Sequence, residues 1–211
     1  MPREQIVATA LSILDEEGPE ALSLRALAQR LESGTATLYR HFDSRANLLN
    51  EVVDKVIGEV RLDAVRVAEM SWQDACRALA SALFEVLCRH RNAAPLLAQH
   101  IPVGANAMVQ RELALSFLLS AGFPPAIAVR SYATISRHVL GFAMQLAPQG
   151  DDERGDAQVA EKIRELDPDG FPATRAVAHA LPIALEDEFK FGLDLIITGL
   201  EAIRAAEDAD E

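Results

Sequence analysis

The sequence predicts an all-α protein in which a small N-terminal helix-turn-helix unit precedes a larger helical bundle. Apolar residues recur at intervals of three and four along most of the chain, which is the spacing of one helix face. No segment alternates apolar and polar residues as a half-buried strand does. Three helical segments fall within about the first 40 residues, and a tight turn joins two of them, as in helix-turn-helix units.

The first two helices are predicted from amphipathic spacing and from residues that start or stop helices. The first spans 4–17, where apolar residues form one stripe, and Gly18 and Pro19 end it. Ser23 is expected to cap the second helix, because its side-chain oxygen can accept a hydrogen bond from a backbone N–H of the first turn. Leucine and alanine residues share one face of this second helix and should pack inward.

A tight turn and two further helices complete the N-terminal part. The turn is expected at 32–34, and a short third helix follows over 35–41. Asp43 or Ser44 is expected to cap a fourth helix over 45–66, whose long apolar stripe connects the small unit to the bundle.

The bundle is predicted from longer amphipathic segments that proline and glycine separate. Ser71 and Asp74 form a start similar to a capping box. The bundle helices are expected at 71–90, 93–99, 105–121, 125–147 and 182–206. Residues 148–181 have the composition of loops around one weak helix at 157–166. We therefore divide the chain into a helix-turn-helix domain of residues 1–48 and a ligand-binding and dimerisation domain of residues 49–211.

Composition and charge restrict the class of protein. The chain is 50% hydrophobic with a formal net charge of −12, so it is globular and does not coat nucleic acid with its whole surface. Residues 21–45 nevertheless hold four arginines against two acidic residues, which is compatible with a local basic face. We find no signal peptide, no membrane-spanning run and no metal-type cysteine spacing, and we therefore expect a cytoplasmic protein.

The segment TATLYRHF at 35–42 brings hydroxyl, aromatic and cationic side chains together on a short helix. In a helix-turn-helix protein the second helix of the motif lies in the major groove, and its N-terminal residues reach base edges. Leu38 and Phe42 have the spacing to face the core, whereas Thr35 and Thr37 suit base edges. The candidate DNA-binding residues, which include flanking arginines for phosphate contact, are Arg25, Thr35, Ala36, Thr37, Tyr39, Arg40, His41 and Arg45.

The segment ALSLRALAQRLESGTATLYRHFDSRANLL resembles the DNA-binding domain of the TetR family of bacterial transcriptional regulators. The resemblance covers about residues 3–50 and rests on the Leu-Ala pair, the tight turn, TLYRHF and a basic residue three positions after the Phe. It implies a homodimeric repressor that binds palindromic double-stranded DNA and responds to a small-molecule effector. It also implies that the candidate residues other than Arg40 lie where family members contact DNA. The turn departs from the family's usual Gly-Val-Ser and reads Glu32-Ser33-Gly34.

Two C-terminal segments, SWQDACRALASALFEVLCRHR and FKFGLDLIITGLEAI, are similar to the tetracycline-repressor branch of this family. That branch binds a magnesium–tetracycline complex, and the positions of its pocket His and Asn residues fall here on Arg61, Leu79 and Leu97. These side chains cannot replace the metal and drug contacts. We therefore predict that tetracycline is not the effector and that the protein needs no metal or other cofactor.

The last predicted helix, 182–206, is expected to form much of a dimer interface together with helix 125–147. Its apolar residues lie near heptad spacing, and two glycines seven positions apart would let another helix approach closely. The candidate interface residues are Phe189, Gly192, Leu193, Ile196, Gly199, Leu200 and Ile203. The alternative is that this stripe packs only within its own chain.

A small-molecule pocket is expected inside the bundle, with apolar walls and a few polar groups. The candidate lining residues are Phe84, Leu87, Leu97, His100, Met108, Phe117, His138, Phe142 and Met144. An ordinary helical core contains the same kinds of residue, so the alternative is that these side chains only pack the bundle.

The sequence thus favours a ligand-responsive DNA-binding regulator over an enzyme, because no nucleophile motif, catalytic triad order or phosphate-binding loop is present. In the expected mechanism, a bound ligand shifts helix 45–66, which changes the spacing of the two reading helices and releases the DNA. The alternative is a ligand-sequestering or protein-binding helical bundle that does not bind an operator.

Overall fold

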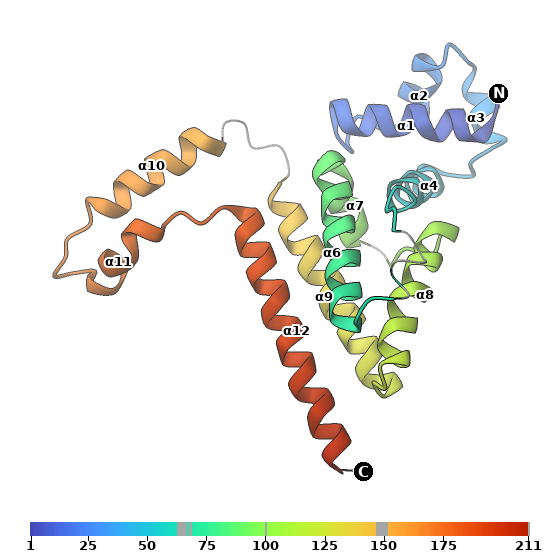
Figure 1. The fold of residues 1–211 in the computed structure, drawn as a ribbon. Coiled ribbons are helices and arrows are strands. Elements are labelled where there is room, and N and C mark those ends of the chain that lie inside the picture. The colour runs from blue at the N-terminus through green and yellow to red at the C-terminus, as the bar shows by residue number, and fades with distance from the viewer. Residues whose placement is uncertain (63–66, 68, 100, 147–151, 211) are drawn as a thin grey trace.

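The computed structural model describes residues 1–62, 67, 69–99, 101–146 and 152–210. Throughout these ranges the chain forms helices joined by turns and contains no β-strand, which confirms the predicted all-α class. Figure 1 shows a small N-terminal unit at one end, a bundle of longer helices below it, and a pair of helices that projects from the bundle.

The N-terminal unit follows the predicted order. Its helices are α1 (Arg3–Glu17), α2 (Leu24–Arg30) and α3 (Thr35–Tyr39), and α4 (Arg45–Ile57) connects it to the bundle. The predicted caps form: Ser23 Oγ accepts a hydrogen bond from the backbone N–H of Ala26, and Ser44 Oγ accepts one from that of Asn47, each at 3.1 Å. Gly18 ends α1 with φ 84°, a conformation that glycine adopts without steric cost.

Side chains from all four of these helices share one core. Leu38 and Phe42 are completely buried, at 0% exposure, which confirms the inward face predicted for the third helix. α3 ends at Tyr39 and is therefore two residues shorter than predicted. The other completely buried apolar residues of this unit include Ile6, Ala10, Leu14, Leu22, Leu27, Leu48 and Val52.

The bundle is built around one central helix. Its helices are α6 (Trp72–Arg89), α7 (Ala94–Gln99), α8 (Ala105–Ser120), α9 (Pro125–Gln145) and α12 (Leu185–Asp210), with the 3-10 turn η1 (Arg91–Ala93) before α7. α9 contacts the other four. Ser71 caps α6 as predicted, since its Oγ accepts from the backbone N–H of Asp74 at 3.1 Å and donates to that residue's carboxylate at 2.7 Å.

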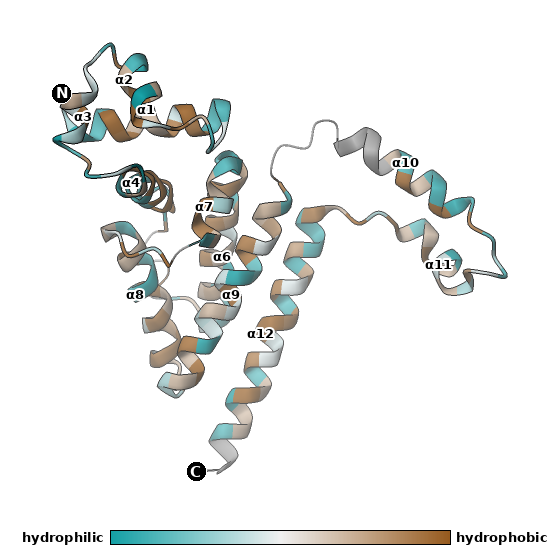
Figure 2. Cartoon of the chain, turned by 180° about the vertical axis from the view of Figure 1, so that it is seen from behind, coloured by the Kyte–Doolittle hydropathy of each residue, from teal (hydrophilic) through white to brown (hydrophobic). Residues whose placement is uncertain are grey.

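The segment between α9 and α12 contains more helix than predicted. It forms α10 (Asp152–Arg164), α11 (Pro172–Val177) and the 3-10 turn η2 (Ala178–Ala180). These elements contact one another and extend away from the bundle as an arm, which Figures 1 and 2 show from opposite sides. Only the weak helix at 157–166 was predicted here; α11 has six residues, too few to show a helical period in the sequence.

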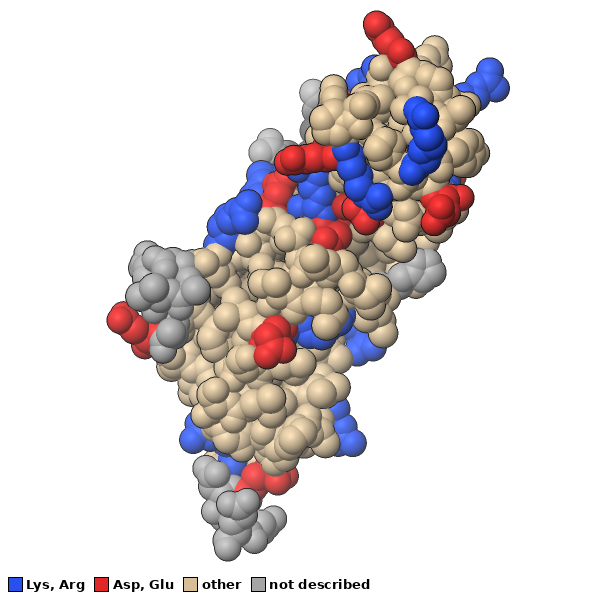
Figure 3. Space-filling view, turned by 90° about the vertical axis from the view of Figure 1, so that its right-hand side faces the viewer, with Lys and Arg blue, Asp and Glu red and all other residues tan. Residues whose placement is uncertain are grey.

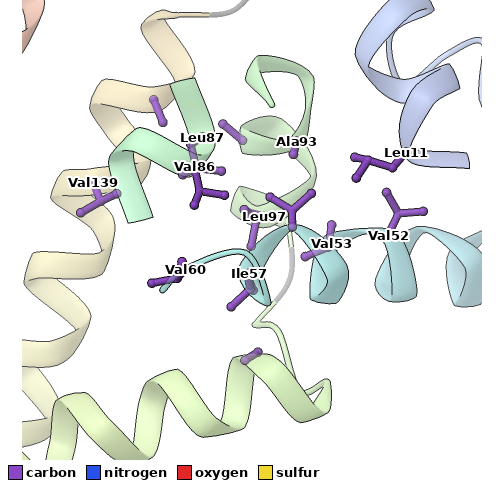
Figure 4. Close-up of a cluster of buried hydrophobic side chains, with 14 of the residues drawn as sticks. Leu11, Val52, Val53, Ile57, Val60, Val86, Leu87, Ala93, Leu97 and Val139 are labelled. Carbon is purple, nitrogen blue, oxygen red and sulfur yellow. The ribbon is translucent and has the colours of Figure 1, made fainter. Parts of the chain in front are cut away.

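α4 belongs to both parts of the molecule. It packs against α1 on one side and against α6, α7 and α8 of the bundle on the other. Figure 4 shows the resulting continuous core, in which Leu11 of α1 lies near Val52 and Val53, and Ile57 lies near Leu97 of the bundle. The helix ends at Ile57 rather than at 66, because Gly58 and a turn follow it; residues 63–66 lie outside the described part of the chain.

In the described ranges, none of the helices combines the length with the apolar character that a membrane crossing requires.

Candidate nucleic-acid interface and ligand cavity

α3 presents one outward face, and this face carries the predicted DNA-binding residues. Thr35 and Ala36 at its start are exposed, Thr37 is half-buried, and the Tyr39 side chain is 59% exposed. Leu38 anchors the opposite face in the core. The helix therefore holds hydroxyl and phenol groups toward solvent from a fixed base, which is the geometry that a groove-reading helix requires.

The four arginines predicted around this face have different environments. Arg25 and Arg40 are exposed; Arg40 donates to Thr37 Oγ1 at 3.3 Å, and Arg25 has no side-chain partner among the described residues. Arg30 instead forms ion pairs with Glu16 at 2.9 Å and Glu17 at 2.6 Å. Its hydrogen bonds to these carboxylates raise its pKa, and its charge is paired within the protein at the surface. In Figure 3, basic and acidic side chains both appear over the N-terminal unit at the top of the view.

Arg45 has an internal role that the sequence did not indicate. Its Nε donates to the backbone carbonyl of Leu22 at 2.6 Å, and its Nη2 donates to that of Pro19. The guanidinium therefore ties the α1–α2 connection to the start of α4. Arg45 still lies at the exposed surface, so these contacts also fix the direction in which its positive charge is held.

Arg3 is a residue of this region that sequence reasoning missed. Its guanidinium lies 4.7 Å from the centre of the Phe42 ring, and its Nη1 donates to the backbone carbonyl of His41 at 2.9 Å. It also forms an ion pair with Glu51 of α4 at 3.1 Å. Arg3 thus links α1, the segment that follows α3, and α4, through contacts that span about 40 residues of sequence and leave no local signal.

The tight turn places Glu32 in the left-handed region, with φ 48°. A residue with a Cβ is strained in this region, which glycine occupies readily. Gly34, by contrast, has φ −76°, and nothing lies within 4 Å of the position that a Cβ would occupy there. The left-handed position of this turn is therefore occupied by Glu32, and the glycine lies two residues later, where the backbone does not require one.

Asp54 of α4 caps a helix of the bundle. Its carboxylate accepts hydrogen bonds from the backbone N–H of Ala107 at 2.9 Å and from the backbone N–H of Asn106 at 3.2 Å. These are the second and third residues of α8, and Gly104 at the N-cap has no side chain to satisfy them. A Cβ on Gly104 would lie 2.2 Å from the Asp54 carboxylate carbon, so glycine permits this close approach.

A second joint between the two parts holds the end of α1. His90 Nδ1 lies 2.9 Å from the carboxylate of Asp15, and its Nε2 lies 3.1 Å from that of Glu59. Asn92 Nδ2 donates to the backbone carbonyl of Leu14 at 2.8 Å. Partial burial raises the pKa of Glu59, but His90 and Arg89 outweigh this effect and leave that pKa below its usual value.

A cavity of about 130 Å³ lies in the bundle beneath α4. Ile57 and Val60 form one wall, and residues of α6, α7, α8 and α9 form the others. The polar side chains that line it are Cys76, Gln110, Arg111, Tyr132 and Ser136. Burial raises the pKa of Cys76 to about 11, so its thiol stays protonated and chemically inert at neutral pH.

Two of the predicted pocket residues, Leu97 and Phe117, line this cavity. So does Leu79, one of the positions aligned with the tetracycline-binding residues. Leu87 is completely buried in the core, and the side chains of Met108 and Met144 are 47% and 46% exposed at the surface. His100 lies outside the described residues.

The remaining predicted pocket residues form an aromatic cluster between α6, α9 and α12. The rings of Phe84 and Phe189 stack at 4.2 Å, and His138 lies 5.2 Å from Phe189 and 4.8 Å from Phe142. The Nε2–H of His138 donates to the backbone carbonyl of Phe189 at 2.9 Å. A Cβ on Gly192 would lie 2.6 Å from the His138 ring, so this glycine serves packing within the chain.

α12 buries part of the predicted interface stripe within its own chain and leaves the rest exposed. Three predicted interface residues are buried in their own chain because α12 packs on α9 and α6: Phe189, Leu193 and Leu200. Ile196 is partly buried, whereas Gly199 and Ile203 are exposed. The large exposed apolar residues of α12 are Phe191, Leu195 and Ile203, at 66%, 58% and 42% exposure. Figure 2 shows hydrophobic residues recurring along this helix.

Comparison with known proteins agrees with this architecture over both parts of the chain. Residues 6–52 match the family described as bacterial regulatory proteins, tetR family, and residues 68–204 match the tetracyclin repressor-like C-terminal domain. A transcriptional regulator of the HTH type from Saccharopolyspora erythraea is 30% identical over 209 residues, covering 98% of this chain and 87% of the relative. The class G tetracycline repressor of Vibrio anguillarum is 28% identical over 202 residues, covering 95% and 94%.

A similar solved structure is that of the TetR family protein ActR from Streptomyces coelicolor in complex with actinorhodin. It superposes with a TM-score of 0.83 at 31% identity and covers 96% of this chain and 97% of the other. The helix-turn-helix unit, the bundle and the sequence matches lead to one conclusion: this chain belongs to the tetR family of bacterial regulatory proteins.

Proposed function

We propose that this protein is a transcriptional repressor that binds a palindromic operator as a homodimer and releases it when a small, largely apolar molecule occupies the bundle cavity. The observation that supports the proposal is that α4 contacts both the N-terminal unit and the helices around the cavity. The helix that positions the reading unit, α4, also forms a wall of the cavity and caps the cavity helix α8.

The DNA-binding part of the proposal rests on the outward face of α3. Thr35, Ala36 and Thr37 suit base edges at the N-terminal end of the reading helix, and Tyr39 has its phenol exposed for a phosphate oxygen. Arg25 and Arg40, with their charges unpaired by acidic groups, provide the phosphate contacts that orient the unit. Arg45 also holds the unit together, whereas His41 contributes only its backbone carbonyl to the bond from Arg3 and keeps its imidazole for a phosphate contact.

The homodimer part rests on the exposed apolar residues of α12. Phe191, Leu195 and Ile203 follow one another at intervals of four and eight residues and leave a hydrophobic stripe on the surface. Gly199, where a Cβ would meet nothing within 4 Å, lies on the same exposed side and allows a second helix to approach closely. We propose that the same stripe of a second copy covers it.

The release mechanism follows from the bonds between Asp54 of α4 and the N-terminus of α8. An effector that enters between α8 and α9 moves α8, and α8 carries the N–H groups that Asp54 holds. Movement of α4 then changes the separation of the two reading helices, which must match half-sites roughly 34–36 Å apart. The effector releases DNA only to the extent that it prefers the non-binding conformation.

Selection of duplexes from random DNA tests this function directly. The purified dimer is expected to retain a palindromic sequence at about 0.15 M salt. On the selected duplex, Thr37→Ala should change base preference, whereas Arg130→Ala, an exposed arginine of α9, should leave binding unchanged. Retention of no specific sequence would contradict the proposal and favour a helical bundle that sequesters ligand or binds protein.

A further inference from the structure

The few polar side chains of the cavity indicate which molecules it accepts. Its walls are mainly apolar, and none of the described lining residues is acidic. Gln110 and Arg111 of α8 are among its few polar lining residues, together with Cys76, Tyr132 and Ser136. We propose that the effector is a compact aromatic compound, neutral or anionic, that donates a hydrogen bond to Gln110 and accepts one from Arg111. This inference rests on the proposed role of the cavity as the effector site.

Gln110 provides an unused hydrogen-bond acceptor. Its Nε2 donates to the backbone carbonyl of Val60 at 3.4 Å, and its Oε1 is buried and accepts no hydrogen bond from the described residues. The opposite orientation of the amide would place two oxygens against each other, so the hydrogen bond to Val60 assigns Nε2 to that contact and leaves Oε1 as the unpaired acceptor. A buried acceptor without a donor is costly, and a ligand hydroxyl or N–H removes this cost.

Arg111 provides a cation without an anionic partner. Its Nη2 donates to the backbone carbonyl of Pro102 at 2.7 Å, its Nη1 lies 2.8 Å from the Met108 sulfur, and its guanidinium carbon lies 5.9 Å from the centre of the Tyr132 ring. None of these groups carries a negative charge. In a largely apolar cavity this charge attracts an anion or a strong acceptor and repels a cation.

The size and walls of the cavity favour a ring system. A volume of about 130 Å³ is similar to the roughly 150 Å³ of an engineered apolar cavity that admits benzene. Phe117 and Tyr132 line it from α8 and α9, so an aromatic ligand can contact aromatic side chains of both helices. A larger effector can place one ring in this volume and its remaining atoms toward the mouth.

The experiment uses four naphthalene probes and isothermal titration calorimetry on the full-length protein. 2-Naphthol and 2-methylnaphthalene differ in the donor, and 2-naphthoate and 2-naphthylmethylammonium differ in charge. The Gln110→Met substitution removes the acceptor. It should lower the affinity for 2-naphthol about tenfold and leave the affinity for 2-methylnaphthalene nearly unchanged. Gln110→Leu repeats this measurement with a second apolar side chain, and Gln145→Met, at an exposed position of α9, is the matched control.

The charge preference is measured in the same way. 2-Naphthoate should bind at least tenfold more tightly than 2-naphthylmethylammonium, and Arg111→Met should remove that preference while Arg130→Met retains it. Binding of the probes with no effect of either cavity substitution would overturn the inference and leave the cavity as an effector site. If none of the four probes binds, both the inference and the role of the cavity are contradicted, whereas operator binding is judged separately by duplex selection.

Discussion

The Asp54 cap gives the most specific structural prediction. Replacing Asp54 by alanine removes the acceptors for two backbone N–H groups of α8 and one of the two acceptors of Asn106 Nδ2, which keeps its bond to the backbone carbonyl of residue 54. Loss of a helix cap of this kind costs about 0.5–2 kcal/mol. Because Gly104 cannot replace the cap, we expect the upper part of this range, about 1–2 kcal/mol in the free energy of unfolding.

Urea unfolding followed by circular dichroism, at one fixed protein concentration, measures this loss. In thermal unfolding of a chain of this length, each kcal/mol of lost stability lowers Tm by about 2–4 °C. Asp54→Asn keeps one oxygen but turns an N–H₂ group toward other donors, so it should also destabilise. Asp43→Ala is the control, since this exposed carboxylate has no hydrogen-bond partner among the described residues.

The same variant tests the coupling between the cavity and the DNA-binding unit. If α8 moves α4 through this cap, Asp54→Ala should still bind the selected duplex and the cavity probes but lose most of the ligand-induced release, which is typically worth about 1–3 kcal/mol. A loss of stability no larger than that of Asp43→Ala, together with unchanged release, would refute the reasoning.

Three further predictions concern the turn, the acid range and the aromatic cluster. Glu32→Gly should be more stable than Glu32→Ala by up to about 1 kcal/mol, because glycine adopts φ 48° without strain. Both substitutions remove the charge, so the comparison isolates the backbone effect. Equal urea midpoints for the two variants would contradict this prediction. The pKa of Glu59 is lower in the folded state than its ordinary value, so its stabilising contribution is present above that ordinary value and is lost as the pH falls through the folded pKa. Glu59→Gln should flatten this part of a stability–pH curve, and an unchanged slope would show that the contacts of Glu59 with His90 and Arg89 contribute nothing. Gly192→Ala should destabilise by about 1–3 kcal/mol through overpacking against His138. Gly141→Ala, at an exposed position of α9 with nothing within 4 Å of the Cβ position, is the control; a Tm for Gly192→Ala as high as that of this control would contradict the close approach.

Local signals in the sequence predicted the helices well and their mutual rotations poorly. The caps at Ser23, Ser44 and Ser71, and the buried positions of Leu38 and Phe42, follow from residue types and spacing alone. These features depend on contacts within one or two helical turns. They therefore leave a signature in a short stretch of sequence.

The long-range contacts had no such signature. The bonds from Arg45 to the α1–α2 connection, and from Asp54 to α8, join residues that lie 23–53 positions apart. On α12, spacing alone identified an apolar stripe, but the packing of α12 on α9 and α6 decides that Phe189 lies inside and Phe191 outside. The same uncertainty in helix rotation explains why only some of the predicted pocket residues line the cavity.

The central claim is that the outward face of α3 reads DNA while nearby arginines hold the phosphates. Fluorescence anisotropy on the selected duplex, titrated over a range of salt concentrations, tests it most directly with Arg25→Ala and Thr37→Ala. We predict that Arg25→Ala weakens binding to all sequences and reduces the slope of log K against log salt by about 1, while Thr37→Ala keeps the slope and alters sequence preference. Unchanged affinity, slope and preference in both variants would contradict the account.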